Sequence, residues 1–453
     1  MAKSRRKPKT APNVLQNSLV SLWHKIAANP QPPAIDRFLA RELSKLDGMS
    51  RKDRLWLGDI LTDALRFGAL TLFCESWRRE GWQAADTAAA HLAQHNQPMG
   101  PELWRRLSRL PAPIVFFWTF MRKRLTGAEL PAVSAPGPDA NEVWRTVRHE
   151  CPASEVLALR SLWAGLPPGM IPQLENRIAA SGWSNQDALT FLDQHAARPP
   201  VWLRLLRPDV AETLREELAT AQFSSREAGL AWSVKGVGGI FELPSYRAGN
   251  FDIQDFASQG IGDAVKARPG ELIWDCCAGA GGKSLQLAAS MAGEGTVTAS
   301  DLHEGKLKDL RRRAERAGLA NIQASVWDGK SVPDFSDAVK AQGGFDAVLV
   351  DAPCSGSGTW RRNVDGRLRL VPADLARWTE VQDFLLELVA EAVRPKGRLV
   401  YATCSWLTAE NEQVIDAFLA KNPSWQLISQ ALAGNPQANS DTTFWAVMQR
   451  RQK

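Results

Sequence analysis

Two short apolar runs constrain the fold of this chain more than any other feature. They are FDAVLVDAPCSGSG at Phe345–Gly358 and LVYATCS at Leu399–Ser405. Each run begins with β-branched and apolar residues and ends in small and reactive ones, which is typical of a buried parallel strand where it leaves its sheet. Because α/β sheets bind ligands at that carboxyl edge, we expect Asp351, Cys354 and Cys404 to meet there. The alternative is a pair of inert buried cysteines, since free cysteine is often buried.

The chain around these runs alternates between strand and helix patterns from about residue 260 onward. Strands are predicted at 271–277, 296–301, 322–328, 345–351 and 398–403, with 443–449 a candidate for a last strand. Helices are predicted at 282–291, 304–317, 375–393 and 409–420. Alternation on this scale indicates an α/β fold with a doubly wound, Rossmann-like parallel sheet.

The first part of the chain has helical periodicity instead. In the segment Ser50–Gly68, Ser50 and Asp53 form a capping pair and Gly68 is placed to end the helix. Arg and Trp residues interleaved in this part could stack on bases, but Trp on an amphipathic helix is more often core. A chain of 453 residues suggests two or three domains. We expect an all-α domain at 1–130, a linker at 131–140, a small α+β module at 141–235 and the Rossmann-like domain at 236–453.

Composition and charge limit the remaining classes. The net charge of +6 permits a polyanionic partner without requiring one. The six cysteines include no CxxC pair, so we expect no disulfide framework and no metal site. No apolar stretch has the length of a signal peptide or a membrane span, and the basic segment Lys3–Lys9 is interpreted as a solvated tail. We therefore expect a soluble, cytoplasmic protein that binds no membrane and has no obligate protein partner.

A glycine-rich turn after the first predicted strand is the candidate cofactor site. The turn DCCAGAGGKS covers Asp275–Ser284 and opens a helix, so its backbone amides and the helix N-terminus can face a ligand. Its spacing is not GxGxxG. Three acids, Asp301, Asp328 and Asp351, end the following strands, and Asp301 comes 26 residues after Asp275, where an acid can bind ribose hydroxyls. Each acid could instead cap the next helix.

The ribose geometry does not distinguish NAD from S-adenosylmethionine, but the thiols do. Hydride transfer requires no cysteine nucleophile. Methylation of carbon 5 of a pyrimidine does, because that carbon is not nucleophilic until a thiolate adds to carbon 6 of the ring. The residues therefore favour S-adenosyl-L-methionine as the cofactor over NAD.

At these residues the chain resembles the Nop/Sun/RsmB family of S-adenosylmethionine-dependent RNA cytosine-5 methyltransferases. The pairing of DAPCSGSG with YATCS carries the resemblance, supported by RPPVWLR at 198–204, FDIQD at 251–255, CAGAGGK at 277–283 and SWLTAENEQV at 405–414. The resemblance implies that Cys404 is the nucleophile and that Cys354 helps to resolve the covalent adduct, with Asp351 also placed to contact the base. It implies a cofactor site made of Cys277, Ala278, Gly279, Ala280, Gly281, Gly282, Lys283, Asp301, Asp328 and Asp351.

The resemblance also suggests a substrate and a role for the first part of the chain. That part resembles the NusB-like RNA-binding domain of the bacterial 16S rRNA enzyme of this family, so 16S rRNA is the leading expectation. Transfer RNA is an alternative substrate, and DNA is a weaker one. Rivals from other classes are a non-catalytic RNA-binding ribosome assembly factor and a Rossmann dehydrogenase. Four arginines after the first motif are interpreted either as phosphate ligands or as a solvated loop: Arg361, Arg362, Arg367 and Arg369.

Overall fold

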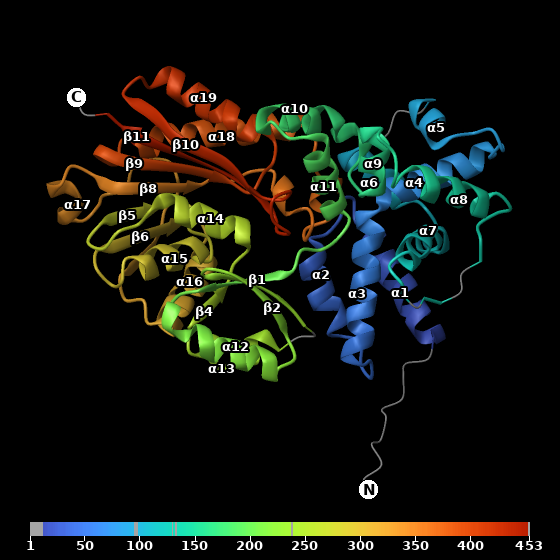
Figure 1. Ribbon diagram of the computed structural model, residues 1–453, viewed down its shortest axis with the longest axis horizontal. Coiled ribbons are helices and arrows are strands. Elements are labelled where there is room, and N and C mark those ends of the chain that lie inside the picture. Colours follow the sequence, from blue (N-terminus) through green and yellow to red (C-terminus); the bar gives the residue numbers. More distant parts are fainter. Residues whose placement is uncertain (1–11, 95–97, 129, 132–133, 237–238, 452–453) are drawn as a thin grey trace, which may run out of the picture. The chain divides into compact units, whose positions relative to one another are not determined.

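The computed structural model describes residues 12–94, 98–128, 130–131, 134–236 and 239–451 (Figure 1). The predicted tail Lys3–Lys9 lies outside these residues. Packing divides the chain into two units. Unit 1 comprises Met1–Asn176, Ser184–Arg198 and Trp360–Val371, and unit 2 comprises Arg177–Trp183, Pro199–Thr359 and Pro372–Lys453. Within the described ranges, no helix combines the length and the apolar character that a membrane crossing requires.

Unit 1 is helical and is built around aromatic side chains. Its helices are α1 (Pro12–Ala27), α2 (Ile35–Leu43), α3 (Arg51–Arg66), α4 (Gly68–Glu80), α5 (Ala88–Gln94), α6 (Gly100–Leu107), α7 (Ala112–Arg124), α8 (Ala140–Glu150), α9 (Leu157–Trp163) and α11 (Asn185–His195), with α10 (Ile171–Ser181) divided between the units. Trp23, Trp77, Trp104 and Trp118 are almost completely buried. These four side chains are therefore core residues, and the suggestion that they stack on bases is wrong.

The start of α3 is confirmed, but its predicted end is wrong. The Ser50 side chain accepts a hydrogen bond from the Asp53 backbone amide, which caps the helix as expected. Gly68 does not end α3. It is the first residue of α4, where a Cβ atom would lie 2.5 Å from a methyl carbon of Leu107. Gly68 therefore permits close helix packing rather than a helix stop.

The packing groups the helices differently from the predicted ranges. Helices α8 and α9 contribute Val143, Trp144 and Leu162 to the same core as α1 to α7, so they belong to unit 1 rather than to an α+β module that begins at residue 141. Helices α8 and α9 thus continue the helical packing, because their apolar faces complete the first core. The division of the chain into separate domains at 1–130, 131–140, 141–235 and 236–453 remains a prediction.

The segment Trp360–Val371 contains the four arginines that follow the first motif, and two of them are buried. Arg361 and Arg367 are 1% and 2% exposed inside unit 1. The Arg361 guanidinium donates to the Ala197 carbonyl, and that of Arg367 donates to the Trp360 carbonyl at 2.7 Å. Burial lowers the pKa of Arg367 to about 9. These two side chains therefore donate hydrogen bonds to backbone carbonyls in a helical core. The interpretation of Arg361 and Arg367 as phosphate ligands is wrong. Arg362 and Arg369 are partly exposed.

Unit 2 begins with a small antiparallel sheet whose strand order is β2-β3-β1-β4. Its elements are β1 (Val201–Leu205), α12 (Ala211–Thr220), β2 (Ser224–Ala228), β3 (Ala231–Lys235), α13 (Pro244–Arg247) and β4 (Phe251–Ile253). Leu203, Trp232 and Phe251 form its core with Leu214 from α12. The VWLRLL segment supplies β1, and the sheet gains its last strand, β4, from residues beyond 235.

The main sheet of unit 2 has seven strands in the order β10-β11-β9-β8-β5-β6-β7. They are β5 (Leu272–Asp275), β6 (Thr296–Asp301), β7 (Ile322–Val326), β8 (Phe345–Asp351), β9 (Val393–Thr403), β10 (Trp425–Gly434) and β11 (Thr442–Arg450). Strands β5 to β9 pair in parallel, and β11 runs antiparallel to β9 and β10. The expected α/β fold with a Rossmann-like, doubly wound sheet is confirmed. Sequence patterns missed β10, whose side chains are mostly exposed.

Helices cover both faces of this sheet, as Figure 1 shows. They are α14 (Phe256–Val265), α15 (Gly282–Ser290), α16 (Glu304–Ala317), α17 (Asp337–Ala341), α18 (Pro372–Ala390) and α19 (Glu412–Lys421). Successive residues of β8 enter different cores: Val348 packs with α18 and α19, and Leu349 packs with α14 and α15. Two covered faces explain why β8 reads as a continuous apolar run. The strand order reverses between β5 and β8, where such sheets bind ligands.

Candidate functional site

The two cysteines of the sequence motifs lie side by side. Cys354 follows β8 and Cys404 follows β9, and these neighbouring strands pair in parallel with Asp351 opposite Ala402. The two Sγ atoms are 3.3 Å apart, within the range of a thiol hydrogen bond. Both side chains are partly exposed. The structure therefore brings both thiols to the edge of the sheet, where a substrate can reach them.

Hydrogen bonds hold the two cysteine loops together. The Gly358 amide donates to the Cys404 carbonyl at 2.9 Å. The Ser357 and Ser405 hydroxyl oxygens are 2.8 Å apart, and both side chains are fully buried. Sequence reasoning assigned no role to Ser357, although its place in the SGSG run was a usable signal. The distance between the sulfurs is thus fixed by loop contacts as well as by strand pairing.

Asp351 lies at the end of β8 and pairs with Lys283. The Lys283 Nζ atom is 2.6 Å from the nearer carboxylate oxygen of Asp351. Burial by itself lowers the pKa of Lys283, but the Asp351 carboxylate outweighs it and holds that pKa above its ordinary value. Lys283 is therefore a cation at neutral pH, placed where the glycine turn meets the strand of the first motif.

The glycine turn is open on one side and closely packed on the other. Gly279 and Gly281 have φ values of 57° and 87°, which favour glycine. A Cβ atom at Gly279 would meet nothing within 4 Å, whereas one at Gly281 would lie 2.5 Å from Leu310. The Gly279 amide donates to the Asp301 carboxylate at 3.0 Å. The turn therefore exposes backbone at Gly279 next to an acid, on the N-terminal side of α15.

The predicted acids lie at the carboxyl ends of adjacent strands. Asp301 ends β6, is 8% exposed, and also accepts a hydrogen bond from the His303 amide. Asp328 lies two residues beyond β7, is exposed and accepts a hydrogen bond from the Lys330 amide. Both acids thus stabilise local turns, and neither is the N-cap residue of the next helix, which is His303 for α16 and Ser336 for α17. Asp301 also contacts the glycine turn.

Asp275 is buried beneath the turn. It is 1% exposed and accepts a hydrogen bond from the Ser284 hydroxyl at 2.6 Å, while its Oδ1 atom has no hydrogen-bond partner among the described residues. Burial raises its pKa to about 6, although Ser284 opposes the shift. An acid whose pKa is raised in the folded state gives the fold stability that is lost as the pH rises from its unfolded pKa to that folded value.

We expect Asp275→Asn to stabilise the protein at neutral pH and not in acid. The folded pKa of about 6 lies above the ordinary 3.8, so the wild type loses stability as the pH rises from about 4 to 6. The variant should gain roughly 1 to 3 kcal/mol at pH 7, since each unit is worth about 1.4 kcal/mol. Urea unfolding at pH 4.5 and pH 7.5 measures this. A larger gain at the lower pH would contradict the assignment.

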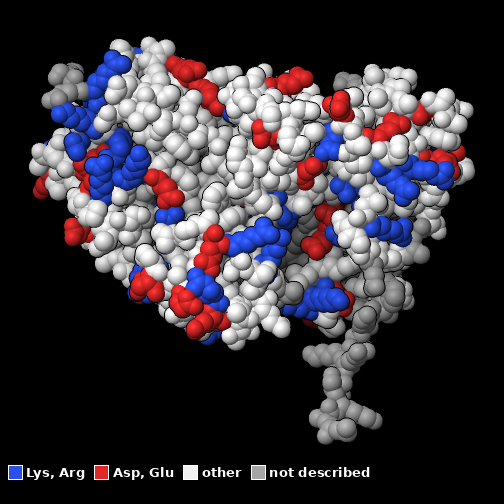
Figure 2. Space-filling model, in the orientation of Figure 1, with Lys and Arg blue, Asp and Glu red and all other residues white. Residues whose placement is uncertain are grey.

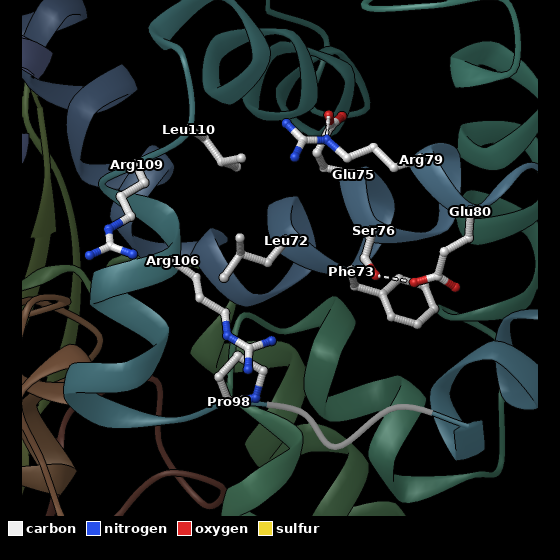
Figure 3. Close-up of a pocket in the computed structure, with 10 residues that line it drawn as sticks. All are labelled: Leu72, Phe73, Glu75, Ser76, Arg79, Glu80, Pro98, Arg106, Arg109 and Leu110. Atoms are coloured by element: carbon white, nitrogen blue, oxygen red, sulfur yellow. Dashed lines mark hydrogen bonds and ion pairs between the residues drawn. The ribbon is translucent and has the colours of Figure 1, made fainter.

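A separate hollow lies within unit 1 and combines groups of both signs (Figure 3). Figure 3 shows Ser76 bonded to Glu80, at 2.9 Å. Arg79 donates to Glu75 at 2.7 Å, so these charges compensate each other. The hollow contains no thiol and none of the motif residues. The chemistry of the motifs therefore belongs to unit 2.

Comparison with known proteins agrees with this location. The family described as 16S rRNA methyltransferase RsmB/F matches residues 263–451. Residues 263–451 belong to the RsmB/F family. This region contains the glycine turn, Asp301, Asp351 and both motif cysteines.

Curated relatives match a similar part of the chain. A probable ribosomal RNA small subunit methyltransferase B of Synechocystis is 35% identical over 226 residues, which are 49% of this chain and 49% of that protein. The protein of the same description from Bacillus subtilis is 34% identical over 236 residues, 51% of this chain and 52% of its own length. The chain thus spans about half the length of the curated relatives that it matches.

Solved structures share the fold of this chain. The crystal structure of PH0851 has a TM-score of 0.66 at 19% identity and covers 98% of this chain and 100% of its own. The structure of NSun6 from Pyrococcus horikoshii with SFG has a TM-score of 0.53 at 14% identity and covers 62% of this chain and 98% of its own. At these identities the likeness concerns the fold alone.

Proposed function

We propose that this protein is an S-adenosylmethionine-dependent methyltransferase that forms 5-methylcytosine in RNA, with 16S rRNA as the leading substrate. The observation that carries the proposal is the pair of thiols 3.3 Å apart at the carboxyl edge of the sheet. Relatives described as ribosomal RNA small subunit methyltransferases support the choice of rRNA. A Rossmann dehydrogenase would have no use for the thiol pair.

Cofactor binding is assigned to the glycine turn and the acids beside it. The open backbone at Gly279 and the carboxylate of Asp301 fit an adenosine ribose, and the unpartnered Oδ1 atom of Asp275 marks a polar interior beneath the turn. The wider set of predicted ligands is Cys277, Ala278, Ala280, Gly281, Gly282, Lys283, Asp328 and Asp351. When bound, S-adenosylmethionine supplies an electrophilic methyl group.

The proposed reaction uses covalent catalysis. The Cys404 thiolate attacks carbon 6 of a cytosine that has been turned out of its stack, and a sulfur–carbon bond forms. Carbon 5 then becomes nucleophilic and accepts the methyl group. The carbon-5 proton is then lost to solvent, the sulfur–carbon bond breaks and Cys404 leaves as the thiolate, which restores the aromatic ring. Cys354 assists this elimination. Asp351, the last residue of β8, is assigned the contact with the polar edge of the base.

We expect Asp301→Ala to weaken S-adenosylmethionine binding by about 1 to 3 kcal/mol, the cost of an unmade buried hydrogen bond. The variant also loses the acceptor for the Gly279 amide, so the turn loses part of its support. Titration calorimetry with the full chain measures the affinity. Asp309→Ala is a matched control, because Asp309 is an exposed acid of α16 that pairs with Arg312. Unchanged affinity for Asp301→Ala would remove this acid from the site.

RNA binding is the remaining part of the proposal. On the face drawn in Figure 2, basic and acidic side chains are interspersed. We therefore assign RNA recognition to local contacts rather than to the net charge of +6. Unit 1 is proposed as the NusB-like RNA reader, on the resemblance of its sequence. Transfer RNA remains the alternative substrate.

Bisulfite mapping of ribosomal and transfer RNA tests the function directly. Cells that lack the gene should lose one or a few 5-methylcytosines in 16S rRNA, and the wild-type gene should restore them. Complementation with Cys404→Ala should not. Restoration of growth and ribosome assembly by that variant, without any methylation difference, would favour a non-catalytic assembly factor. If these cells lost a 5-methylcytosine in transfer RNA and none in 16S rRNA, transfer RNA would be the substrate.

A further inference from the structure

Two consecutive buried residues each hold one of the cysteine loops. They are Glu410 and Asn411, which lie in the SWLTAENEQV segment directly before the first residue of α19, and neither is exposed. The proposed reaction gives neither residue a task. Glu410 binds the loop of Cys354, and Asn411 binds the loop of Cys404.

Glu410 binds Ser355, the residue next to Cys354, through both of its carboxylate oxygens. Its Oε1 atom accepts a hydrogen bond from the Ser355 amide at 2.7 Å, and its Oε2 atom accepts one from the Ser355 hydroxyl at 2.5 Å. Gln382 of α18 also donates to Oε1, at 3.3 Å. Within the part of the chain that the structure describes, Glu410 forms no ion pair. A carboxyl group that is fully buried without a cation beside it is costly, so a function for Glu410 is expected.

Asn411 contacts the residues on both sides of Cys404. Its Oδ1 atom accepts a hydrogen bond from the Thr403 hydroxyl at 2.6 Å, and its Nδ2 atom donates to the Ser405 carbonyl at 3.0 Å. Thr403 and Ser405 are fully buried. Because Glu410 and Asn411 are adjacent in the chain, one short segment fixes the position of both cysteine loops.

The charged groups around the two thiols are distributed unequally. Burial, Asp351, Asp275 and Cys404 all act on Lys283, so this cation lies in the field of Cys404. Glu410 instead acts on Cys354. The hydrogen bond with Cys404 raises the pKa of Cys354 well above its ordinary value, and burial, Cys404 and Glu410 add to that effect. Cys354, Glu410, Asp383 and Asp351 all act on Tyr401, whose pKa is raised well above its ordinary value, chiefly by burial. Burial also raises the pKa of Asp383.

We propose that Glu410 is a positioning residue that makes the two adjacent thiols unequal: it holds the loop of Cys354 through Ser355 and sets a carboxylate near that sulfur, so that Cys404 rather than Cys354 is the thiol that attacks. The inference rests on the proposed function only in naming Cys404 as the attacking thiol. It explains how two sulfurs in contact avoid exchanging roles. Asn411 supplies the matching restraint on the other loop.

Alkylation of the free protein tests the inference without RNA or cofactor. The full chain is treated with iodoacetamide between pH 6 and pH 9.5, and initial modification of each cysteine is measured by peptide mass spectrometry. In the wild type, Cys404 should react faster than Cys354 at pH 8. In Glu410→Gln, which keeps the size of the side chain but removes its charge, Cys354 should react roughly three to ten times faster, because the thiolate fraction rises about tenfold for each unit of pKa lost.

Two further variants separate charge from structure. Glu410→Asp retains the carboxylate and should keep Cys354 slow. Glu412→Gln removes a carboxylate two residues away that pairs with Arg177 at 2.7 Å, and should leave both alkylation rates unchanged. Unaltered Cys354 reactivity in a folded Glu410→Gln protein would overturn the inference. Faster alkylation of Cys354 than of Cys404 in the wild type would overturn it even if that variant did not fold.

The outcome is independent of the proposed reaction. A protein with the expected alkylation order that transfers no methyl group to RNA would refute the proposed function and leave the unequal thiols established. A protein that methylates RNA but alkylates in the opposite order would refute the role of Glu410 alone.

Discussion

Cys404→Ala is expected to abolish methyl transfer, whereas Cys354→Ala should trap the protein on its RNA. Without the Cys404 thiolate, carbon 5 of the base is never activated, so the rate should fall by on the order of 10³-fold or more. Cys354 lies 3.3 Å from the sulfur that must leave, and its pKa is raised well above the ordinary value, first by the hydrogen bond with Cys404 and then by burial. It is therefore a protonated thiol at the bond to be broken.

Labelled rRNA and denaturing gels measure both effects. Cys354→Ala should give a slowly migrating, denaturant-resistant complex that requires the cofactor, and Cys404→Ala should give none. Cys151→Ala is the control, because this cysteine is buried in the core of unit 1 and should tolerate the change with methyl transfer intact. A trapped complex in Cys404→Ala would reverse the two roles. Full activity in both variants would refute covalent catalysis.

Gly358→Ala is expected to destabilise the protein by about 3 kcal/mol or more and to displace the cysteine loops. A Cβ atom at Gly358 would lie 1.8 Å from the Thr442 carbonyl oxygen and 3.0 Å from that of Cys404. Both obstacles are backbone, which cannot rotate away, so the loop or β11 must move. The hydrogen bond from the Gly358 amide to the Cys404 carbonyl would be strained by the same movement.

Gly356→Ala provides a matched comparison two residues earlier. Its Cβ atom would meet only the Thr359 hydroxyl oxygen, at 3.6 Å, so the cost is the left-handed φ of 69°, about 1 to 2 kcal/mol. Urea unfolding of both variants should therefore rank Gly358→Ala as the less stable. Equal stability, or a more stable Gly358→Ala, would show that the close packing against Thr442 is not required.

The sequence by itself determined that the chain forms a parallel sheet and which reactive residues lie at the ends of its strands. The runs at 296–301 and 345–351 became β6 and β8 with the predicted bounds. In β8 the signal was a largely apolar run that ends sharply, because that strand is covered on both faces. That pattern also predicted the meeting of Asp351, Cys354 and Cys404, since parallel strands deliver their carboxyl ends to one edge. The strand β10 was not predicted from the sequence, because its exposed side chains follow no clear hydrophobic period.

Tertiary structure alone decided which polar residues face inward. Arg361 and Arg367 follow the first motif in sequence, but they are buried in unit 1 and bound to carbonyls, which no local pattern reveals. Glu410 likewise looks like an ordinary helix-start acid until its carboxylate is seen to bind Ser355, 55 residues earlier. Local sequence specifies periodicity and backbone preference, whereas the partner of a polar side chain depends on segments that only folding brings together.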